Sequence, residues 1–271
     1  MTPENDEIPP EARNFKVKLP DGETYDVSGP SKTLKKIDED DSLAERFDEA
    51  ALERAEDIFE SGHLLSRIKK GETVLYIGTG SGHVADHIEK ETGAKIIKFD
   101  LADLRTPADI KDDKFALANA RRLPVKDNSL DTICLFDLLH HTLNQNDILK
   151  EALRVLKPGG KLLIMEDTIP EKFQKGVKFK KWIVGKMDDI LNQQPTGANP
   201  HNYQSISDWE ILLHKVGFNI DSNKTFSWHW GIPDLVGADR TKRPDHNTLL
   251  RPFEATMFEA IKPIEAEMKE K

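Results

Sequence analysis

Short apolar runs alternate with helically spaced apolar positions through the middle of the chain. Strands are predicted for the runs at 73–77, 95–99, 115–118, 132–136 and 161–166, then near 218–227 and at 255–261. Helices are predicted between them, over 83–92, 145–156 and 206–216. This alternation predicts an α/β fold with a doubly wound, largely parallel, Rossmann-like sheet.

The first part of the chain carries different patterns. Residues 1–41 are predicted to form a polar N-terminal arm and then a small hairpin, in which apolar and charged residues alternate around an Asp-Gly turn. Residues 42–70 are predicted to form an N-terminal helical cap of two helices, broken at Ser61-Gly62. Both segments therefore precede the region that carries the sheet pattern.

The main domain is predicted to occupy residues 71–264. It contains two segments outside the sheet pattern, an insertion at 170–204 after the fifth strand and a polar loop at 228–252. The insertion begins with apolar residues at helical spacing among five closely spaced lysines, a pattern that fits either a solvated amphipathic helix or a lid over a substrate. Residues 265–271 are expected to be a solvated, charged tail.

Composition and charge narrow the classes of function. The 271 residues include 39 Lys plus Arg against 48 Asp plus Glu, and this net charge of −9 argues against nucleic acid as the main partner. No stretch approaches the roughly 18 apolar residues of a membrane helix, and the acidic N-terminus is unlike a secretory leader. We therefore expect a cytoplasmic protein without membrane insertion. The single cysteine, Cys134, lies in an apolar run and is expected to be buried.

The apolar run at 73–77 ends in a glycine-rich turn that opens into a helix. Such a turn exposes backbone N–H groups at the positive end of the helix, and small residues let a ligand approach them. The spacing Gly78-x-Gly80-x-Gly82 departs from the Gly-x-Gly-x-x-Gly pattern of dinucleotide oxidoreductases. The turn therefore predicts a site for a nucleotide-like cofactor and disfavours NAD.

Several segments occur in the order and spacing of one enzyme family. They are Val74–Gly82, Asp100, Asn119-Ala120, Leu123–Asp131, Leu139–His141 and Arg154–Gly160. With these segments the chain resembles the class I S-adenosylmethionine-dependent methyltransferases, in particular the small-molecule methyltransferases related to quinone and sterol modifiers. The resemblance implies the seven-stranded sheet of that family. It covers residues 74–164 closely and 205–220 more loosely.

The resemblance implies S-adenosylmethionine as the cofactor and assigns residues to hold it. The glycine loop would receive the methionine portion, and Asp100 would accept from both ribose hydroxyls. Leu101 would pack on the adenine ring, beside Asn119 and Ala120, and Phe136 is expected to line the pocket at the carboxyl end of its strand. The implied cofactor-binding residues are Gly78, Thr79, Gly80, Gly82, Asp100, Leu101, Asn119, Ala120 and Phe136. No metal site is predicted.

Two positions depart from the family pattern. Tyr76 stands where the family usually has Asp or Glu, and Asn119 stands where it usually has Asp. Neither side chain brings a negative charge, although an amide oxygen can still accept from the adenine amino group. One interpretation is that cofactor binding is retained through Asp100 and the glycine loop, and the other is that cofactor use is altered or lost.

Methyl transfer requires alignment more than a particular catalytic residue, because the sulfonium already carries an activated methyl group. If the acceptor needs deprotonation, His141 at the end of the fourth strand is the candidate general base. The alternative for His141 is a packing or loop-capping role.

The predicted function is transfer of a methyl group from S-adenosylmethionine to a small-molecule acceptor, at oxygen, nitrogen or carbon. The lysines at 172–181 leave open an RNA or protein methyltransferase, and the two neutral positions leave open a non-catalytic scaffold of the same fold. The sequence carries no signal for an oligomeric state.

Overall fold

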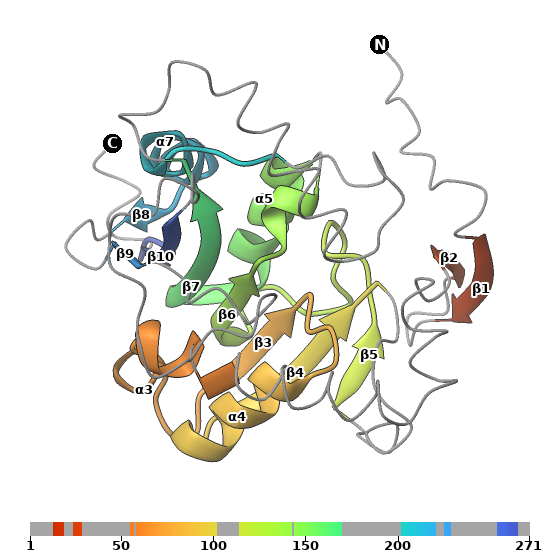
Figure 1. Ribbon diagram of the computed structural model, residues 1–271. Helices are drawn as coiled ribbons and strands as arrows, with labels where there is room; N and C mark the ends of the chain where they lie inside the picture. The colour runs from red at the N-terminus through yellow and green to blue at the C-terminus, as the bar shows by residue number, and fades with distance from the viewer. Residues whose placement is uncertain are drawn as a thin grey trace, which may run out of the picture.

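In the computed structural model, eight strands form one mixed sheet. Seven of them follow the order β5-β4-β3-β6-β7-β10-β8, and β9 pairs with β10 beside β8 (Figure 1). Along this order the strands are β5 (Phe115–Leu117), β4 (Lys95–Asp100), β3 (Thr73–Ile77), β6 (Leu130–Phe136), β7 (Leu156–Thr168), β10 (Glu254–Ile261) and β8 (Asn219–Ile220). The strands from β5 to β7 pair in parallel, and β10 pairs antiparallel with β7 and β8. The predicted Rossmann-like α/β fold is confirmed.

The structure describes the following parts of the chain. Side chains are described for 55–56, 58–101, 114–142, 144–169, 202–220, 225 and 255–264, and backbone alone for 13–18, 24–28, 226–228 and 254. Several predicted segments lie wholly or mostly outside these residues: the start of the arm, the first part of the helical cap, the insertion, the polar loop and the tail. The predicted domain boundaries stay predictions.

The chain reverses its direction of winding between β3 and β6. From β3 it continues outwards to β4 and β5, and it then crosses to the other side of β3 to form β6 and β7. The carboxyl ends of β3 and β6 therefore flank the switch point, where open α/β sheets bind their ligands.

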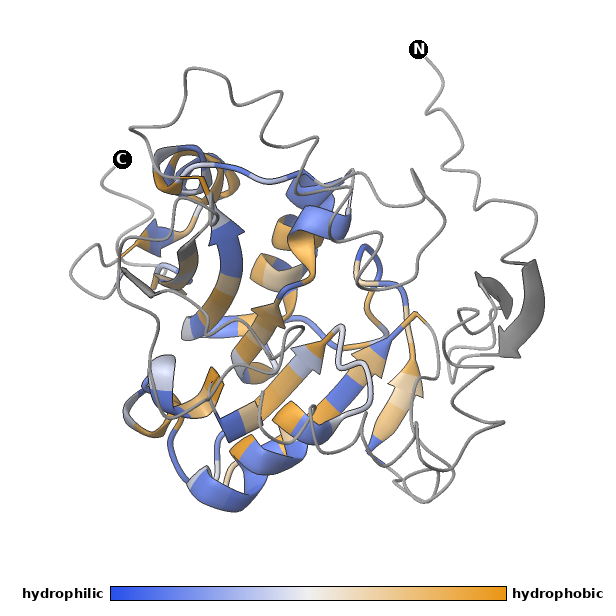
Figure 2. Cartoon of the chain, in the orientation of Figure 1, coloured by the Kyte–Doolittle hydropathy of each residue, from blue (hydrophilic) through white to orange (hydrophobic). Residues whose placement is uncertain are grey.

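Helices cover both faces of this sheet (Figure 1). They are α3 (Leu64–Arg67), α4 (His83–Thr92), the 3-10 helix η2 (Leu139–His141), α5 (Gln145–Val155) and α7 (Ile206–Val216). Helices α3 and α4 pack on one face through a cluster that contains Ile88 and Cys134, whereas α5 and α7 pack on the other around Trp209. Figure 2 shows mostly hydrophobic central strands between helices of mixed hydropathy. Cys134 is buried as predicted, and burial raises the pKa of its thiol.

Capping residues explain where the predicted helices begin and end. Ser205 caps the N-terminus of α7. Its hydroxyl accepts from the backbone N–H of Asp208, and the Asp208 carboxylate accepts from the backbone N–H of Ser205. Helix α7 ends at Gly217, which adopts a left-handed conformation that favours glycine. Helix α4 ends in the same way at Gly93.

Strand β7 begins earlier than predicted, at Leu156, directly after α5. Leu130 pairs with Leu156 and Thr132 with Lys161, so β7 carries extra residues between the two pairs. Gly159 has a φ of 77° in this irregular stretch, and its N–H donates to the Lys262 carbonyl. The Pro-Gly-Gly segment at 158–160, which precedes the strand predicted at 161–166, is therefore a bulged part of the strand.

The strand predicted near 218–227 is interrupted. Its two ends form β8 and β9 (Phe226–Trp228), and both pair with β10. Ile220 pairs with Ala260, whereas Phe226 pairs with Met257. More residues separate Ile220 from Phe226 than separate Met257 from Ala260, so β8 and β9 cannot form one continuous ladder with β10.

The N-terminal hairpin is confirmed at the level of the backbone. Strand β1 (Arg13–Lys18) pairs antiparallel with β2 (Thr24–Ser28) in a separate sheet. In the described part of the helical cap, helical backbone at 58–61 and α3 are separated at Gly62 and His63, close to the predicted break, and His63 has a φ of 50°. Within the described residues, none of the helices has the length and apolar character that crossing a bilayer requires.

A buried ion pair joins the helical cap to the sheet. Nη1 of Arg67 in α3 donates to Oε2 of Glu259 in β10 at 2.6 Å, and the two side chains are 8% and 3% exposed. Removing one member of such a pair leaves the other charge buried without its partner, which costs more than a pair at the surface.

Arg67→Met should lower the free energy of unfolding by about 3–5 kcal/mol, because Glu259 would stay buried without its cation. Lys90→Met is the control, since Lys90 forms an exposed pair with Glu91 at 3.3 Å and should change stability little. Urea unfolding followed by circular dichroism measures both. Equal effects of the two variants would contradict this role for the buried pair.

Candidate functional site

The glycine loop lies at the switch point, between β3 and α4. The Gly78 N–H donates to the Phe99 carbonyl at 2.8 Å, and the Gly82 N–H donates to the Thr79 carbonyl at 2.9 Å. Because Phe99 belongs to β4, the first bond continues the β3–β4 ladder one residue beyond β3. Sheet register therefore places the loop.

Two positions of the loop require glycine for different reasons. Gly78 has a φ of 76°, and a Cβ there would come within 2.9 Å of Cδ1 of Leu138. Gly80 has a φ of 55°, but a Cβ there would meet none of the described atoms within 4 Å. At Gly78 the backbone conformation disfavours a side chain, and the Leu138 side chain would also have to move, whereas at Gly80 the constraint comes from conformation alone.

Asp100 at the end of β4 is brought against this loop. Its Oδ2 accepts a hydrogen bond of 2.9 Å from the Gly80 N–H. The next residue, Leu101, has 53% of its surface exposed, which is high for a large apolar side chain. The structure thus brings the predicted residues Gly80, Asp100 and Leu101 together at the switch point. Their contacts with a cofactor stay predictions.

The loop also contains a buried hydroxyl. Thr79 is 7% exposed, and its Oγ1 has no hydrogen-bond partner among the described residues. A buried hydroxyl without a partner is costly, so a polar ligand group at this position would be favourable. Helix α4 begins at Gly82 without a side-chain cap, which adds a positive helix end. Both features fit the carboxylate-bearing amino-acid end of S-adenosylmethionine.

Tyr76 and Phe136 lie in the core below the loop. Tyr76 is 3% exposed, and its ring meets that of Phe136 edge-on with centroids 5.3 Å apart. Close to the loop, Lys98 and Asp86 form an ion pair, and the Lys98 Nζ would lie 3.7 Å from a Cβ at Gly82. The charged side chains next to the loop therefore include the Lys98–Asp86 pair. A contact between Phe136 and the cofactor stays a prediction.

Asn119 and Ala120 follow β5 next to the end of β4. The Ala118 N–H donates to the Asp100 carbonyl at 2.8 Å, which fixes this segment beside Asp100. Oδ1 of Asn119 accepts from the Arg121 N–H at 2.9 Å, a side-chain bond that closes a local turn. Ala120 is 8% exposed. The Asn119 amide oxygen therefore already serves the turn, while its predicted adenine contact stays untested.

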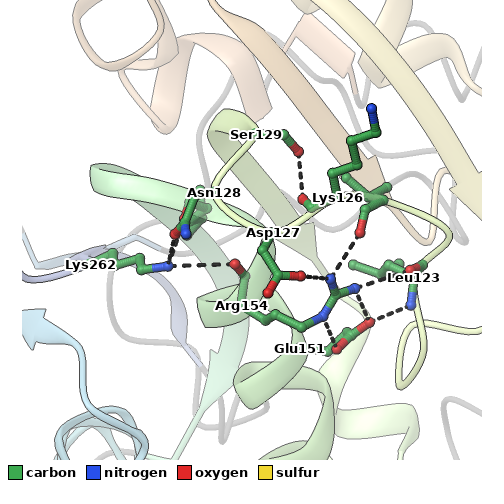
Figure 3. A network of polar contacts seen from close by, with 10 residues as sticks. Leu123, Lys126, Asp127, Asn128, Ser129, Glu151, Arg154 and Lys262 are labelled. Carbon is green, nitrogen blue, oxygen red and sulfur yellow. Dashed lines mark hydrogen bonds and ion pairs between the residues drawn. The ribbon is translucent and has the colours of Figure 1, made fainter.

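A network around Arg154 of α5 holds the segment that follows Asn119 and Ala120 (Figure 3). Its guanidinium donates to the carbonyls of Leu123 and Val125 at 3.1 and 2.9 Å. Glu151 accepts from Arg154 and, at 2.6 Å, from the Leu123 N–H. Hydrogen bonding to Glu151 raises the pKa of Arg154. Helix α5 therefore fixes the loop on the β5 side of the site.

A buried carboxylate organises the other side of the switch point. Glu166 of β7 is fully buried, and its Oε1 accepts from the N–H groups of Leu138 and Leu139 at 3.0 and 2.5 Å. Its Oε2 accepts from Nδ1 of His140 at 2.5 Å. Glu166 thus holds the start of η2, the short helix that carries the predicted general base His141.

His141 is half-buried at the end of η2. Its backbone N–H donates to the Leu138 carbonyl at 3.1 Å, and its ring centroid lies 3.9 Å from that of His140. The structure therefore places His141 at the carboxyl end of β6, as predicted, and its part in catalysis stays a prediction. Among the described residues, no group of three His, Cys, Asp or Glu side chains is arranged to hold a metal ion.

His140 is 5% exposed and lies among carboxylates. Burial is the largest single effect and disfavours the charged form, but it is outweighed by the sum of the Glu166 charge, the Glu166 hydrogen bond and smaller contributions from Asp137 and Asp167. Together they raise the pKa of His140 to about 9. The Glu166–His140 contact is therefore an ion pair at neutral pH.

The end of the predicted insertion returns to this ion pair. The Tyr203 ring stacks on His140 with centroids 4.9 Å apart and an interplanar angle of 18°. The Asn202 N–H donates to the His140 carbonyl at 2.7 Å, and Nε2 of Gln145 donates to the Leu139 and Asn202 carbonyls at 3.0 and 3.2 Å. The residues leading into α7 are thus attached to η2.

Sequence reasoning missed the role of Glu166. One signal was available: an acidic residue closes the run Leu-Leu-Ile-Met-Glu, and a charged residue is seldom fully buried unless it is paired. Its partners could not be identified from the sequence, because they lie in and next to η2, which follows β6, whereas Glu166 belongs to β7. The Lys98–Asp86 pair was missed for the same reason.

The stability of the protein should fall as pH rises between about 6.5 and 9. His140 binds its proton more tightly in the folded state, so its contribution is complete below the unfolded pKa and is lost through the folded pKa of about 9. The slope should approach about 1.4 kcal/mol per pH unit. Urea unfolding across this range measures it, with Glu166→Gln as the comparison. An equal slope in that variant would contradict the assignment.

Known proteins are similar to this chain in sequence and in fold. The family model described as a methyltransferase domain matches residues 46–223, more than half of the chain. The ubiquinone/menaquinone biosynthesis C-methyltransferase of Salmonella arizonae is 32% identical over 116 residues, which are 39% of this chain and 46% of that protein. The chain thus spans less than half the length of this curated relative.

Solved structures share the fold at low sequence identity. A Haloferax volcanii protein assigned as a methyltransferase, solved in complex with a methyltransferase activator, superposes with a TM-score of 0.53 at 18% identity, covering 78% of this chain and 94% of its own. The Haemonchus contortus phosphoethanolamine N-methyltransferase 2, in complex with phosphomonomethylethanolamine and S-adenosylhomocysteine, gives 0.53 at 18% identity, covering 76% and 53%. With the match of the family model, the chain belongs to the class I S-adenosylmethionine-dependent methyltransferases.

Proposed function

We propose that this chain binds S-adenosylmethionine at the switch point and transfers its methyl group to a small molecule. The observation that carries the proposal is the contact between the Gly80 N–H and the Asp100 carboxylate, 2.9 Å apart. It joins a glycine loop at a helix N-terminus to an acidic residue at the end of the next strand, an arrangement suited to a nucleoside with an amino-acid tail.

The residues present would divide the cofactor between them. The loop from Gly78 to Gly82 would hold the amino-acid end, with Thr79 Oγ1 as a hydrogen-bonding group, and Asp100 would accept from the ribose hydroxyls. Leu101 would offer an exposed apolar surface to the adenine. When bound, S-adenosylmethionine supplies an activated methyl group on its sulfonium.

His141 is the candidate general base for an acceptor that loses a proton. It stands on η2 at the carboxyl end of β6, and Glu166 holds the N-terminal residues of that helix. A rigid support suits a group that has to meet an acceptor at a defined position. An acceptor that needs no deprotonation leaves His141 with the packing role that the sequence also allows.

Three observations support a small-molecule acceptor. The net charge is −9, which disfavours binding to a phosphate backbone. The curated relative is named for quinone biosynthesis, and one solved structural neighbour holds a phosphorylated amino alcohol. The lysine cluster behind the RNA or protein alternative lies outside the described residues. A cytoplasmic location stays a prediction.

Gly80→Ala should weaken the binding of S-adenosylhomocysteine by about tenfold or more, because a side chain strains the left-handed backbone of the loop. Gly159→Ala is the matched control, since Gly159 also has a positive φ, of 77°, but lies in the bulge at the start of β7. Isothermal calorimetry measures affinity, and thermal unfolding confirms that both variants fold. Equal affinities in the two variants would count against the loop as the binding site.

Radiolabel from S-adenosylmethionine should enter the small-molecule fraction of a cell extract incubated with the protein. Label in the RNA or protein fraction would replace the proposed acceptor by the corresponding alternative. Saturable cofactor binding with no label in any fraction would favour the non-catalytic scaffold. The matched control is the Gly80→Ala variant, in which labelling should fall with cofactor affinity.

A further inference from the structure

We infer that Asp100 positions the glycine loop in addition to contacting the ribose, so that one carboxylate couples the two ends of the cofactor site. This inference rests on the proposed function and deepens it. A purely ribose-binding Asp100 would affect only ligands that carry ribose hydroxyls. A loop-positioning Asp100 affects every ligand that uses the loop.

Two consecutive residues of β4 hold alternate residues of the loop. The Phe99 carbonyl accepts from the Gly78 N–H at 2.8 Å, and the Asp100 carboxylate accepts from the Gly80 N–H at 2.9 Å. The first contact extends the strand ladder, whereas the second uses a side chain. At Gly80 the chain is past the end of the β3–β4 ladder, so the Asp100 side chain supplies the hydrogen bond in place of a strand carbonyl.

Gly80 carries no side chain that could fix its conformation by packing. A Cβ at this position would meet none of the described atoms within 4 Å, so none of those residues packs against Gly80 on the side where a Cβ would stand. Glycine also has the greatest backbone freedom of any residue. A partly buried hydrogen bond to a carboxylate is stronger than one between neutral groups, and it is the contact that selects the observed Gly80 conformation.

The selected conformation matters for the rest of the site. The residue before Gly80 is Thr79, which carries the buried hydroxyl. Two residues after Gly80 is Gly82, the N-cap of α4, where the helix has no side-chain cap. If the loop were ordered in only a fraction of molecules, the apparent affinity of any ligand that uses it would fall by that fraction. Asp100 therefore acts on the amino-acid end without touching it.

The test compares two ligands in four proteins by calorimetry. The ligands are S-adenosylhomocysteine and its 2′,3′-dideoxy analogue, which lacks the hydroxyls that Asp100 would contact. The proteins are the wild type, Asp100→Ala, Asp100→Asn and Asp131→Ala. Asp131 is the matched control, because its Oδ2 also accepts a backbone N–H, that of Thr73, at 2.9 Å, but at the opposite end of β3.

Asp100→Ala should weaken binding of the dideoxy analogue by about tenfold, the value expected for a lost hydrogen bond to a charged group. Asp100→Asn should keep most of the wild-type affinity for the dideoxy analogue, because its amide oxygen can still accept a hydrogen bond from the Gly80 N–H. Asp131→Ala should bind both ligands as the wild type does. If Asp100→Ala binds the dideoxy analogue within about twofold of the wild type, the inference is overturned and Asp100 serves the ribose alone.

A measurement on the ligand-free wild type separates this inference from the proposed function and requires no variant to fold. In nuclear magnetic resonance spectra recorded across acidic pH, the Gly80 amide should titrate together with the Asp100 carboxyl carbon. Independent titration would contradict the loop contact. If neither ligand binds the wild type while the two signals titrate together, the proposed function fails and the positioning role stands.

Discussion

The candidate site depends on the parallel pairing of β3 with β4. Ile77 pairs with Phe99, and this register brings the glycine loop after β3 level with Asp100 at the end of β4. The hydrogen bond between Gly80 and Asp100 then joins two segments that are twenty residues apart in the sequence. A shift of register by one residue would turn Asp100 to the other face of the sheet and separate the two groups.

A second constraint acts on the other side of the switch point. Glu166 is fully buried and accepts hydrogen bonds from two backbone N–H groups and from His140, so its charge is compensated within η2. A buried carboxylate that lost these donors would be strongly destabilising, which makes the geometry of η2 well defined. Through Tyr203 and Asn202, the same pair reaches the end of the predicted insertion. Strand β7 therefore organises both the candidate general base and the residues that lead into α7.

The elements of the sheet could be predicted because local signals are strong there. Apolar runs, the glycine loop and the capping residues Gly93 and Gly217 act over a few positions, and they mark strands and helices correctly. Asp100 was identified through the resemblance to the methyltransferase family, which has an acidic residue at the end of this strand. The contacts of Glu166 with His140, and of Lys98 with Asp86, join separate elements, and no local pattern specifies such a pair. The bulge at the start of β7 was missed because Pro-Gly-Gly is compatible with both a turn and an irregular strand.

A crystal structure of the protein with S-adenosylhomocysteine tests the central claim most directly. The account predicts the amino-acid end of the ligand against the loop from Gly78 to Gly82, and a ribose hydroxyl within hydrogen-bond distance of the Asp100 carboxylate. Density for the ligand at any other place in the protein, or a ribose turned away from Asp100, would contradict it.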